Sequence, residues 1–154
     1  MRNNKGQAAM EFLMTYGWAI LAAIVAIGVL AYFGVFSPGK LAGSSAIVNN
    51  PFYANSWQVT TTDVNLEMTN NGGDTLVPSL ITVTGTGASG TISCTNSTLP
   101  SSLNPGVQTL FRIPCTTGTL TSGNSFAGNI QITYSKQGSQ LNQTSTGTIR
   151  TSIQ

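Results

Sequence analysis

The residues most informative about chemistry stand near the start of the chain, where a short basic region meets a long apolar one. The junction reads Lys5-Gly6-Gln7-Ala8-Ala9-Met10-Glu11-Phe12. A basic residue and a small residue directly precede the apolar segment, so we predict proteolytic processing between Gly6 and Gln7. Cleavage there would create an amino group on Gln7, four residues before the carboxylate of Glu11.

Glu11 needs a partner if it enters an apolar environment, because an unpaired carboxylate there costs about 3 kcal/mol on insertion scales. Within one straight helix the Gln7 amine and Glu11 need not meet well, but on staggered neighbouring helices they can. Such a pair would set the axial register of the two helices. It adds little net stability, although removing one partner of a buried pair costs about 3 to 5 kcal/mol. The alternative is that Glu11 marks the membrane interface of a single-span protein.

The apolar segment is long enough to span a membrane. No charged residue occurs from Phe12 to Gly39, and a bilayer needs only about 20 apolar residues. A helix over 7–36 would be about 45 Å long, at roughly 1.5 Å per residue. That exceeds a hydrocarbon core of roughly 30 Å, which predicts a tilted helix or a second location outside the bilayer. Ser37-Pro38-Gly39 is predicted to end the helix.

The flanking residues predict how this helix is oriented. Arg2 and Lys5 favour a cytoplasmic N-terminus, which leaves the residues after Lys40 outside. An ordinary secretory signal has a shorter apolar region followed by a small-residue cleavage site. Residues 39–45 are rich in small side chains, but the segment before them is too long for that pattern. The helix is therefore expected to remain in the mature protein.

The segment from Lys5 to Phe12 resembles the class III signal peptide of archaeal type IV pilins. Precursors of that family are cut by a membrane prepilin peptidase before a Gln-x-x-x-Glu-Phe segment. The continuation Leu13-Met14-Thr15-Tyr16-Gly17-Trp18-Ala19-Ile20-Leu21 is also similar to the family. Ala9 stands where the family often has Ser, which is a small-for-small departure. The resemblance covers about the first 40 residues strongly.

The resemblance implies a structural role. Gln7 would be the first mature residue and Glu11 the fifth, and Gln7, Glu11 and Phe12 would serve assembly. The helix would leave the membrane and pack into the core of an extracellular filament, as a homopolymer held by helix–helix packing. The implied partners are the prepilin peptidase and the pilus assembly machinery.

The remainder of the chain predicts a small β-domain. It is rich in Ser and Thr, nearly free of charge, and long enough for one modest core. Alternating segments separated by turn residues predict six or seven strands, at 64–68, 80–86, 91–95, 107–113, 129–135 and 146–152. The expected class is α+β, with an antiparallel, immunoglobulin-like β-sandwich after the helix. The predicted organisation is a signal peptide at 1–6, the helix at 7–36, a linker at 37–50 and the outer domain at 51–154.

Two features of the outer domain suit an exported protein. Cys94 and Cys115 are the only cysteines, and an even count outside the membrane favours a disulfide. Closing a loop of about 20 residues would contribute roughly 3 kcal/mol in the chain-entropy model. The alternative is a pair of buried reduced thiols. Asn96 and Asn142 begin glycosylation sequons, although such triplets often arise by chance in a Ser/Thr-rich chain.

Catalysis has little support in the sequence. There is no histidine, and two cysteines alone do not make a conventional zinc site. Alternation places Asp63 and Glu67 on a solvated strand face and Asp74 in a turn. A net charge of +2 from six scattered bases does not indicate nucleic-acid binding. We therefore predict no enzyme activity, no catalytic residue, no cofactor and no metal.

Three hypotheses follow from the sequence. The first is a pilin, inserted in the cytoplasmic membrane as a precursor and then polymerised into an adhesion pilus on the cell surface. The second is a minor pilin or a membrane-anchored adhesin whose β-domain binds a surface or a glycan. The third is an exported enzyme or solute-binding domain, for which no residue gives positive evidence. An archaellin-like filament subunit is a further structural alternative.

Overall fold

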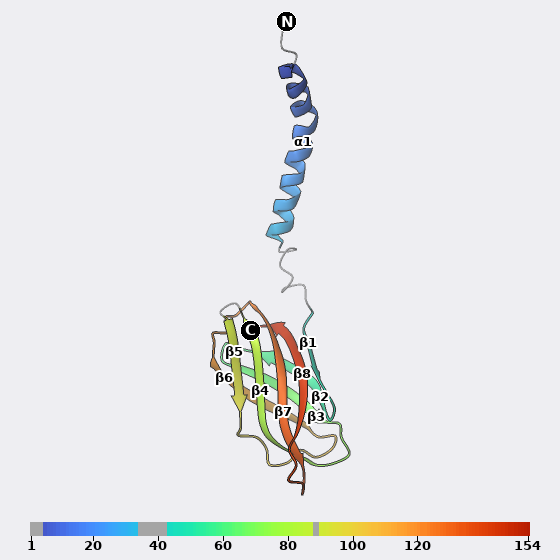
Figure 1. Ribbon diagram of the computed structural model, residues 1–154, viewed down its shortest axis with the longest axis vertical. Coiled ribbons are helices and arrows are strands. Elements are labelled where there is room, and N and C mark those ends of the chain that lie inside the picture. Colours follow the sequence, from blue (N-terminus) through green and yellow to red (C-terminus); the bar gives the residue numbers. More distant parts are fainter. Residues whose placement is uncertain (1–4, 34–42, 88–89) are drawn as a thin grey trace. The chain divides into compact units, whose positions relative to one another are not determined.

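The structure, a computed structural model, describes residues 5–33, 43–87 and 90–154 (Figure 1). The chain divides into a helical unit within 1–41 and a β-unit within 42–154. In the first unit, α1 runs from Lys5 to Tyr32, so the helix begins two residues before the predicted 7–36. The expected end of that helix at Ser37-Pro38-Gly39 lies outside the described residues.

Among its described residues, the β-unit contains eight strands. They are β1 (Ser45–Val48), β2 (Phe52–Val59), β3 (Asp63–Asn70), β4 (Leu76–Gly87), β5 (Gly90–Asn96), β6 (Gln108–Thr117), β7 (Ser125–Lys136) and β8 (Gln143–Ser152). All six predicted segments lie in strands, apart from Val107, which directly precedes β6. The first two strands were not predicted. Because β1 lies inside the predicted linker at 37–50, the β-unit begins earlier than the sequence indicated.

The strands form one antiparallel sheet in the order β1-β8-β7-β4-β5-β6-β3-β2. Four consecutive strands form a Greek key. Strands β4, β5 and β6 are successive neighbours in the sheet, and β3, which precedes them in the chain, lies on the other side of β6. The hairpin of β7 and β8 extends the sheet beside β4, and β1 completes that edge. All these pairs are antiparallel, so the antiparallel β-domain of the predicted α+β class is confirmed.

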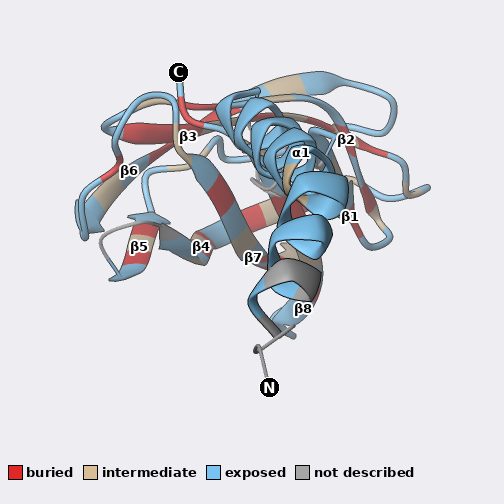
Figure 2. Ribbon diagram, turned by 90° about the horizontal axis from the view of Figure 1, so that it is seen from above, coloured by how far each residue is buried: buried red, intermediate tan, exposed pale blue. Residues whose placement is uncertain are grey.

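The sheet curls until its two edges approach each other, as Figure 2 shows from above. Val59 of β2 forms a parallel bridge with Ile153, just beyond β8, and the Gln154 N–H donates to the Val59 carbonyl at 2.9 Å. These bonds join edge strand β2 to the residues that directly follow β8, the neighbour of the other edge strand, β1. The β-unit is therefore nearly barrel-like, and the predicted immunoglobulin-like sandwich of two sheets is not confirmed.

The core fills the inside of the curled sheet with alternating apolar side chains. Phe126 is one of its largest buried residues, and two glycines make room for it. A Cβ on Gly85 would lie 2.7 Å from the Phe126 ring, and one on Gly128 would lie 2.9 Å from it. Because Gly85 and Gly128 are cross-strand partners on β4 and β7, the ring packs over a glycine pair.

A buried asparagine organises the loops that follow β3. Asn70 is 1% exposed, and its amide makes three hydrogen bonds. The Nδ2 group donates to the carbonyls of Asp74 and Leu103, both at 2.8 Å, and Oδ1 accepts from the Gly72 N–H at 2.9 Å. One side chain therefore joins the end of β3, the loop before β4 and the segment before β6.

Candidate assembly helix and processing junction

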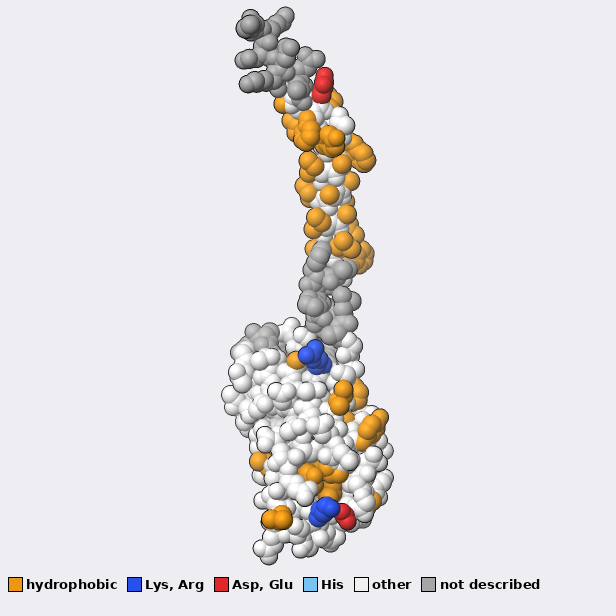
Figure 3. All heavy atoms as spheres, turned by 45° about the vertical axis from the view of Figure 1, so that its right-hand side comes forward, with side chains coloured by type: hydrophobic (Ala, Val, Ile, Leu, Met, Phe, Trp, Pro, Cys, Tyr) orange, Lys and Arg blue, Asp and Glu red, His pale blue; other side chains and the backbone are white. Residues whose placement is uncertain are grey.

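The surface of α1 is apolar on every side. From Ala9 to Tyr32 none of the described side chains is buried, and Met14 and Trp18 have exposed fractions of 80% and 72%. By length and composition, α1 can cross a membrane. Figure 3 shows hydrophobic atoms covering the helix, with acidic atoms at one end. Because a helix that is apolar all round needs lipid or other protein around it, α1 requires a partner outside its own unit.

Glu11 lies near the start of this surface and is exposed. Its backbone carbonyl accepts a hydrogen bond from Thr15 Oγ1 at 2.8 Å, which gives a polar side chain on the apolar helix a local partner. Phe12 contacts Tyr16, with ring centroids 4.7 Å apart. Pairing of Glu11 with the Gln7 amine of a neighbouring copy stays a prediction.

The predicted processing site lies in the first turn of α1, because the helix begins at Lys5 and the Gly6–Gln7 bond follows directly. Terminal helical turns fray readily, since their first N–H groups have no partners within the helix. Gly6 also weakens the turn, because glycine disfavours helix by about 1 kcal/mol relative to alanine. Within the described residues, the predicted cleavage bond therefore lies in a weakly held part of α1.

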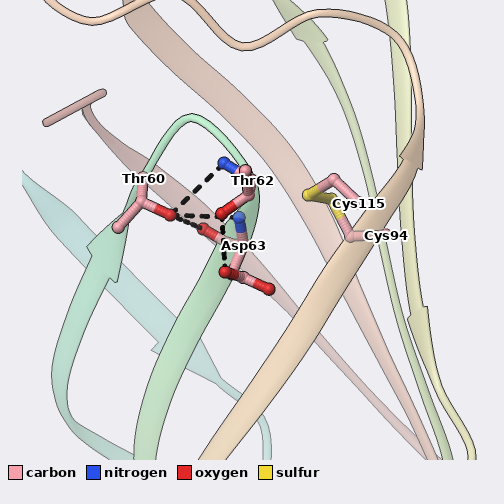
Figure 4. The surroundings of a disulfide bond; sticks show 5 residues. All are labelled: Thr60, Thr62, Asp63, Cys94 and Cys115. Atoms are coloured by element: carbon pink, nitrogen blue, oxygen red, sulfur yellow. Dashed lines mark hydrogen bonds between the residues drawn. A yellow bond between two sulfur atoms is a disulfide. The ribbon is translucent and has the colours of Figure 1, made fainter.

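The disulfide predicted between Cys94 and Cys115 is present. The two cysteines lie directly opposite each other on β5 and β6, and Figure 4 shows the bond between these strands. The β5–β6 ladder is short and irregular, with two register pairs, Ser93 with Thr117 and Cys94 with Cys115. The covalent bond therefore reinforces a sparsely hydrogen-bonded pairing within the sheet.

We expect both cysteines to resist alkylation in native material until a reductant is added. The reason is that the S–S bond consumes both thiols and Cys94 is also buried. Mass spectrometry after unfolding in iodoacetamide, with and without dithiothreitol, measures this directly. Labelling of either cysteine in the unfolded, unreduced sample would contradict the bond.

The two sequons have different surroundings. Asn96 ends β5, its Nδ2 donates to the Arg112 carbonyl at 2.7 Å, and its Oδ1 accepts from the Thr98 N–H at 2.7 Å. Asn142 lies in the loop between β7 and β8 and is exposed. A glycan is attached through Nδ2, so modification of Asn96 would replace one of the two hydrogens of the group that donates to β6 and would place a sugar against that strand.

We therefore predict that Asn142 is glycosylated in native material and that Asn96 carries less glycan. Glycopeptide mass spectrometry gives the occupancy of each site separately. An Asn142→Gln variant should lose the main glycan mass, whereas Asn96→Gln should change it little. Higher occupancy at Asn96 than at Asn142 would show that glycan transfer precedes folding of this strand pair.

The prediction that Asp63 lies on a solvated face is wrong. Asp63 is 6% exposed, because the β2–β3 turn and the neighbouring strand β6 cover it. Arg112 Nη2 lies 2.8 Å from Asp63 Oδ2, and Thr62 Oγ1 donates to the same oxygen at 2.7 Å. The hydrogen bond from Arg112, followed by that from Thr62, lowers the pKa of Asp63 below its ordinary value. Asp63 is thus a charged structural group, and Figure 4 shows it in the turn with Thr60 and Thr62.

The other two acids of the β-unit also have local partners. Glu67, half-buried on β3, accepts a hydrogen bond from Ser56 Oγ at 2.7 Å. Asp74 pairs with Lys136 at 2.7 Å on the surface, and this contact raises the pKa of Lys136. Among the described residues, no group of three or more potential metal ligands comes together.

Trp57 is a structural residue that the sequence reasoning missed. Its Nε1 donates to Ser44 Oγ at 2.7 Å, and Ser44 Oγ donates to Thr151 Oγ1 at 3.0 Å. These bonds hold the first residues of the β-unit against β2 and β8. The sequence feature that could have indicated this role is the presence of a tryptophan in a domain with few aromatic residues.

Comparisons with known proteins do not assign the chain to a family. No protein-family model matches it, and no curated protein matches it significantly. The functional interpretation therefore depends on the N-terminal junction, the surface of α1 and the β-unit.

Proposed function

We propose that this protein is a structural subunit of an extracellular filament, resembling an archaeal type IV adhesion pilin, which polymerises through α1. The observation that carries the proposal is an exposed apolar helix whose first turn contains the Gly6–Gln7 junction and which holds Glu11. Exposing such a helix to water would cost on the order of tens of kcal/mol, at roughly 25 cal/mol per Å² of apolar surface. A bilayer removes that cost for the precursor, and neighbouring helices remove it in a filament.

In the proposed sequence of events, the precursor is held in the cytoplasmic membrane with its β-unit outside. A prepilin peptidase cuts between Gly6 and Gln7, and assembly machinery moves the mature helix into the filament core. The new Gln7 amine of one subunit then pairs with Glu11 of its neighbour. This pairing satisfies a charge that has lost both water and lipid headgroups.

The β-unit suits the outside of such a filament. Figure 3 shows few charged and few hydrophobic side-chain atoms on the visible face of this unit; the rest is backbone and other uncharged side chains. The Cys94–Cys115 bond stabilises it outside the reducing cytoplasm. Adhesion to a surface or a glycan would be the task of this unit.

Surface filaments sheared from the native cells should contain this chain with Gln7 as its N-terminal residue. Removal of residues 1–6 would eliminate Arg2 and Lys5 and create the amine that pairs with Glu11. N-terminal peptide mass spectrometry, combined with filament purification, measures both processing and abundance. An intact Met1 on surface protein, or a start beyond Pro38, would contradict the proposed processing. A chain that starts at Gln7 but is absent from filaments would favour the membrane-anchored adhesin.

A further inference from the structure

The outer face of the curled sheet carries a shallow groove over β1, β8, β7 and β4. It consists of two adjoining hollows of about 380 and 350 Å³. Both hollows are lined by Thr84, Asn129 and Thr148, which face one another in one row across three strands. The hollows are therefore parts of one continuous groove.

The register explains why the sheet is hollowed there. In one neighbouring row, Ala127 stands between Thr86 and Arg150, so a short side chain lies between two longer ones. In the other neighbouring row, Thr82, Gln131 and Thr146 continue the polar lining. From Thr82 to Thr86 the groove extends about 13 Å along the strands, at roughly 3.3 Å per residue. That length matches two or three sugar rings laid end to end.

The lining offers hydrogen bonds with almost no charge. Hydroxyls and side-chain amides both donate and accept, and Arg150 is the one charged side chain among the residues that line the two hollows. Within the described part of the chain, the side chains of Thr84, Asn129 and Thr148 make no hydrogen bonds to protein groups. Their donors and acceptors are exposed and held in line by the sheet. Asn70 and Asn96, by contrast, use their amides to hold the fold together.

We propose that this groove binds a neutral oligosaccharide. A concave surface with aligned polar groups suits a slender ligand that presents hydroxyls on both sides. A strongly anionic or cationic ligand would find little charge to pair with, whereas the mixed polar and apolar lining matches both the hydroxyls and the C–H faces of a sugar. The proposal deepens the proposed function, because it assigns an adhesion target class to the outer face of the β-unit.

The test uses the full chain in detergent micelles with maltohexaose, cellohexaose and chitohexaose as separate probes, titrated by ligand-detected NMR. Wild-type protein is expected to bind at least one of these probes with a measurable Kd. The Thr84→Val/Thr148→Val double variant keeps side-chain shape but removes two hydroxyls, and should weaken binding at least tenfold. Ala127→Leu fills the hollow from an exposed position and should weaken it similarly. Thr116→Val changes an exposed threonine of β6 outside the groove; it is the matched control and should bind like wild type.

Each outcome bears on the proposal. Binding of none of the three probes to wild type, or equal binding by wild type and both groove variants, would overturn it. Loss of filaments in Ala127→Leu, without sugar binding by wild type, would make this face a contact between subunits and also overturn it. Filament formation by wild type is scored separately, so failure of the filament proposal remains distinguishable from failure of the sugar site.

Discussion

Replacing Glu11 with glutamine is expected to reduce filament number at least tenfold while leaving processing and membrane insertion unchanged. Glutamine keeps the size and most of the hydrogen bonding of glutamate but removes its charge. The Gln7 amine of the neighbouring subunit would then be buried without a counter-charge, which costs about 3 to 5 kcal/mol when a buried pair is broken. Because each 1.4 kcal/mol is a factor of ten in an equilibrium constant, even a partly realised penalty is visible in filament yield.

The measurement is electron microscopy of cells that express the variant as their only copy, with immunoblots of membrane and sheared fractions. Phe12→Leu is the matched control, because it changes an adjacent side chain of α1 without altering charge. We expect Phe12→Leu to stay close to wild type. Filaments of normal number and length with Glu11→Gln would assign Glu11 to the membrane interface instead.

Replacing Asn70 with alanine is expected to lower the free energy of unfolding of the β-unit by about 3 kcal/mol. Three hydrogen bonds of a side chain that is 1% exposed would be lost together. The Gly72 N–H and the Asp74 carbonyl lose these bonds, whereas Leu103 keeps its backbone bond from the Leu76 N–H. For a unit of this size, the loss corresponds to a decrease in Tm of roughly 10 °C.

Thermal unfolding of the full chain in detergent, followed by near-ultraviolet circular dichroism, measures this effect. Asn55→Ala is the matched control, because Asn55 is exposed and accepts one hydrogen bond, from Thr69 Oγ1 at 3.0 Å. That variant should lose less than about 1 kcal/mol. Equal losses of unfolding free energy in the two variants would show that Asn70 does not hold together the end of β3, the loop before β4 and the segment before β6.

The strands that the sequence did reveal have an unbroken alternation. In β3, Val64, Leu66 and Met68 are all buried, and the residues between them are half-buried. The missed strand β2 has a register irregularity between Ala54 and Ser56. Phe52 and Ala54 are buried before it and Val59 after it, so one extra residue shifts the period and hides the pattern. Strand β1 is only four residues long and gives too short a signal.

The same distinction applies to the candidate sites. The junction at Gly6, Gln7 and Glu11 could be predicted from the sequence because its residues are close together in the chain. The groove could not be predicted, because strand register brings Thr84, Asn129 and Thr148 together from three separate strands. Nor could alternation reveal that Asp63 would be buried and form an ion pair with Arg112, far along the chain.

By itself, the sequence determined the apolar helix, the β-rich character of the rest of the chain and the pairing of its only two cysteines. The first two properties follow from composition and local periodicity. The third follows from the number of cysteines, because two cysteines allow one intramolecular disulfide. Only the tertiary structure decided that the sheet curls nearly into a barrel, that Asp63 is buried and that Asn96 is engaged while Asn142 is exposed. The physical reason is that closure, burial and hydrogen-bond partners depend on strand register across the sheet, which joins residues that local sequence cannot relate.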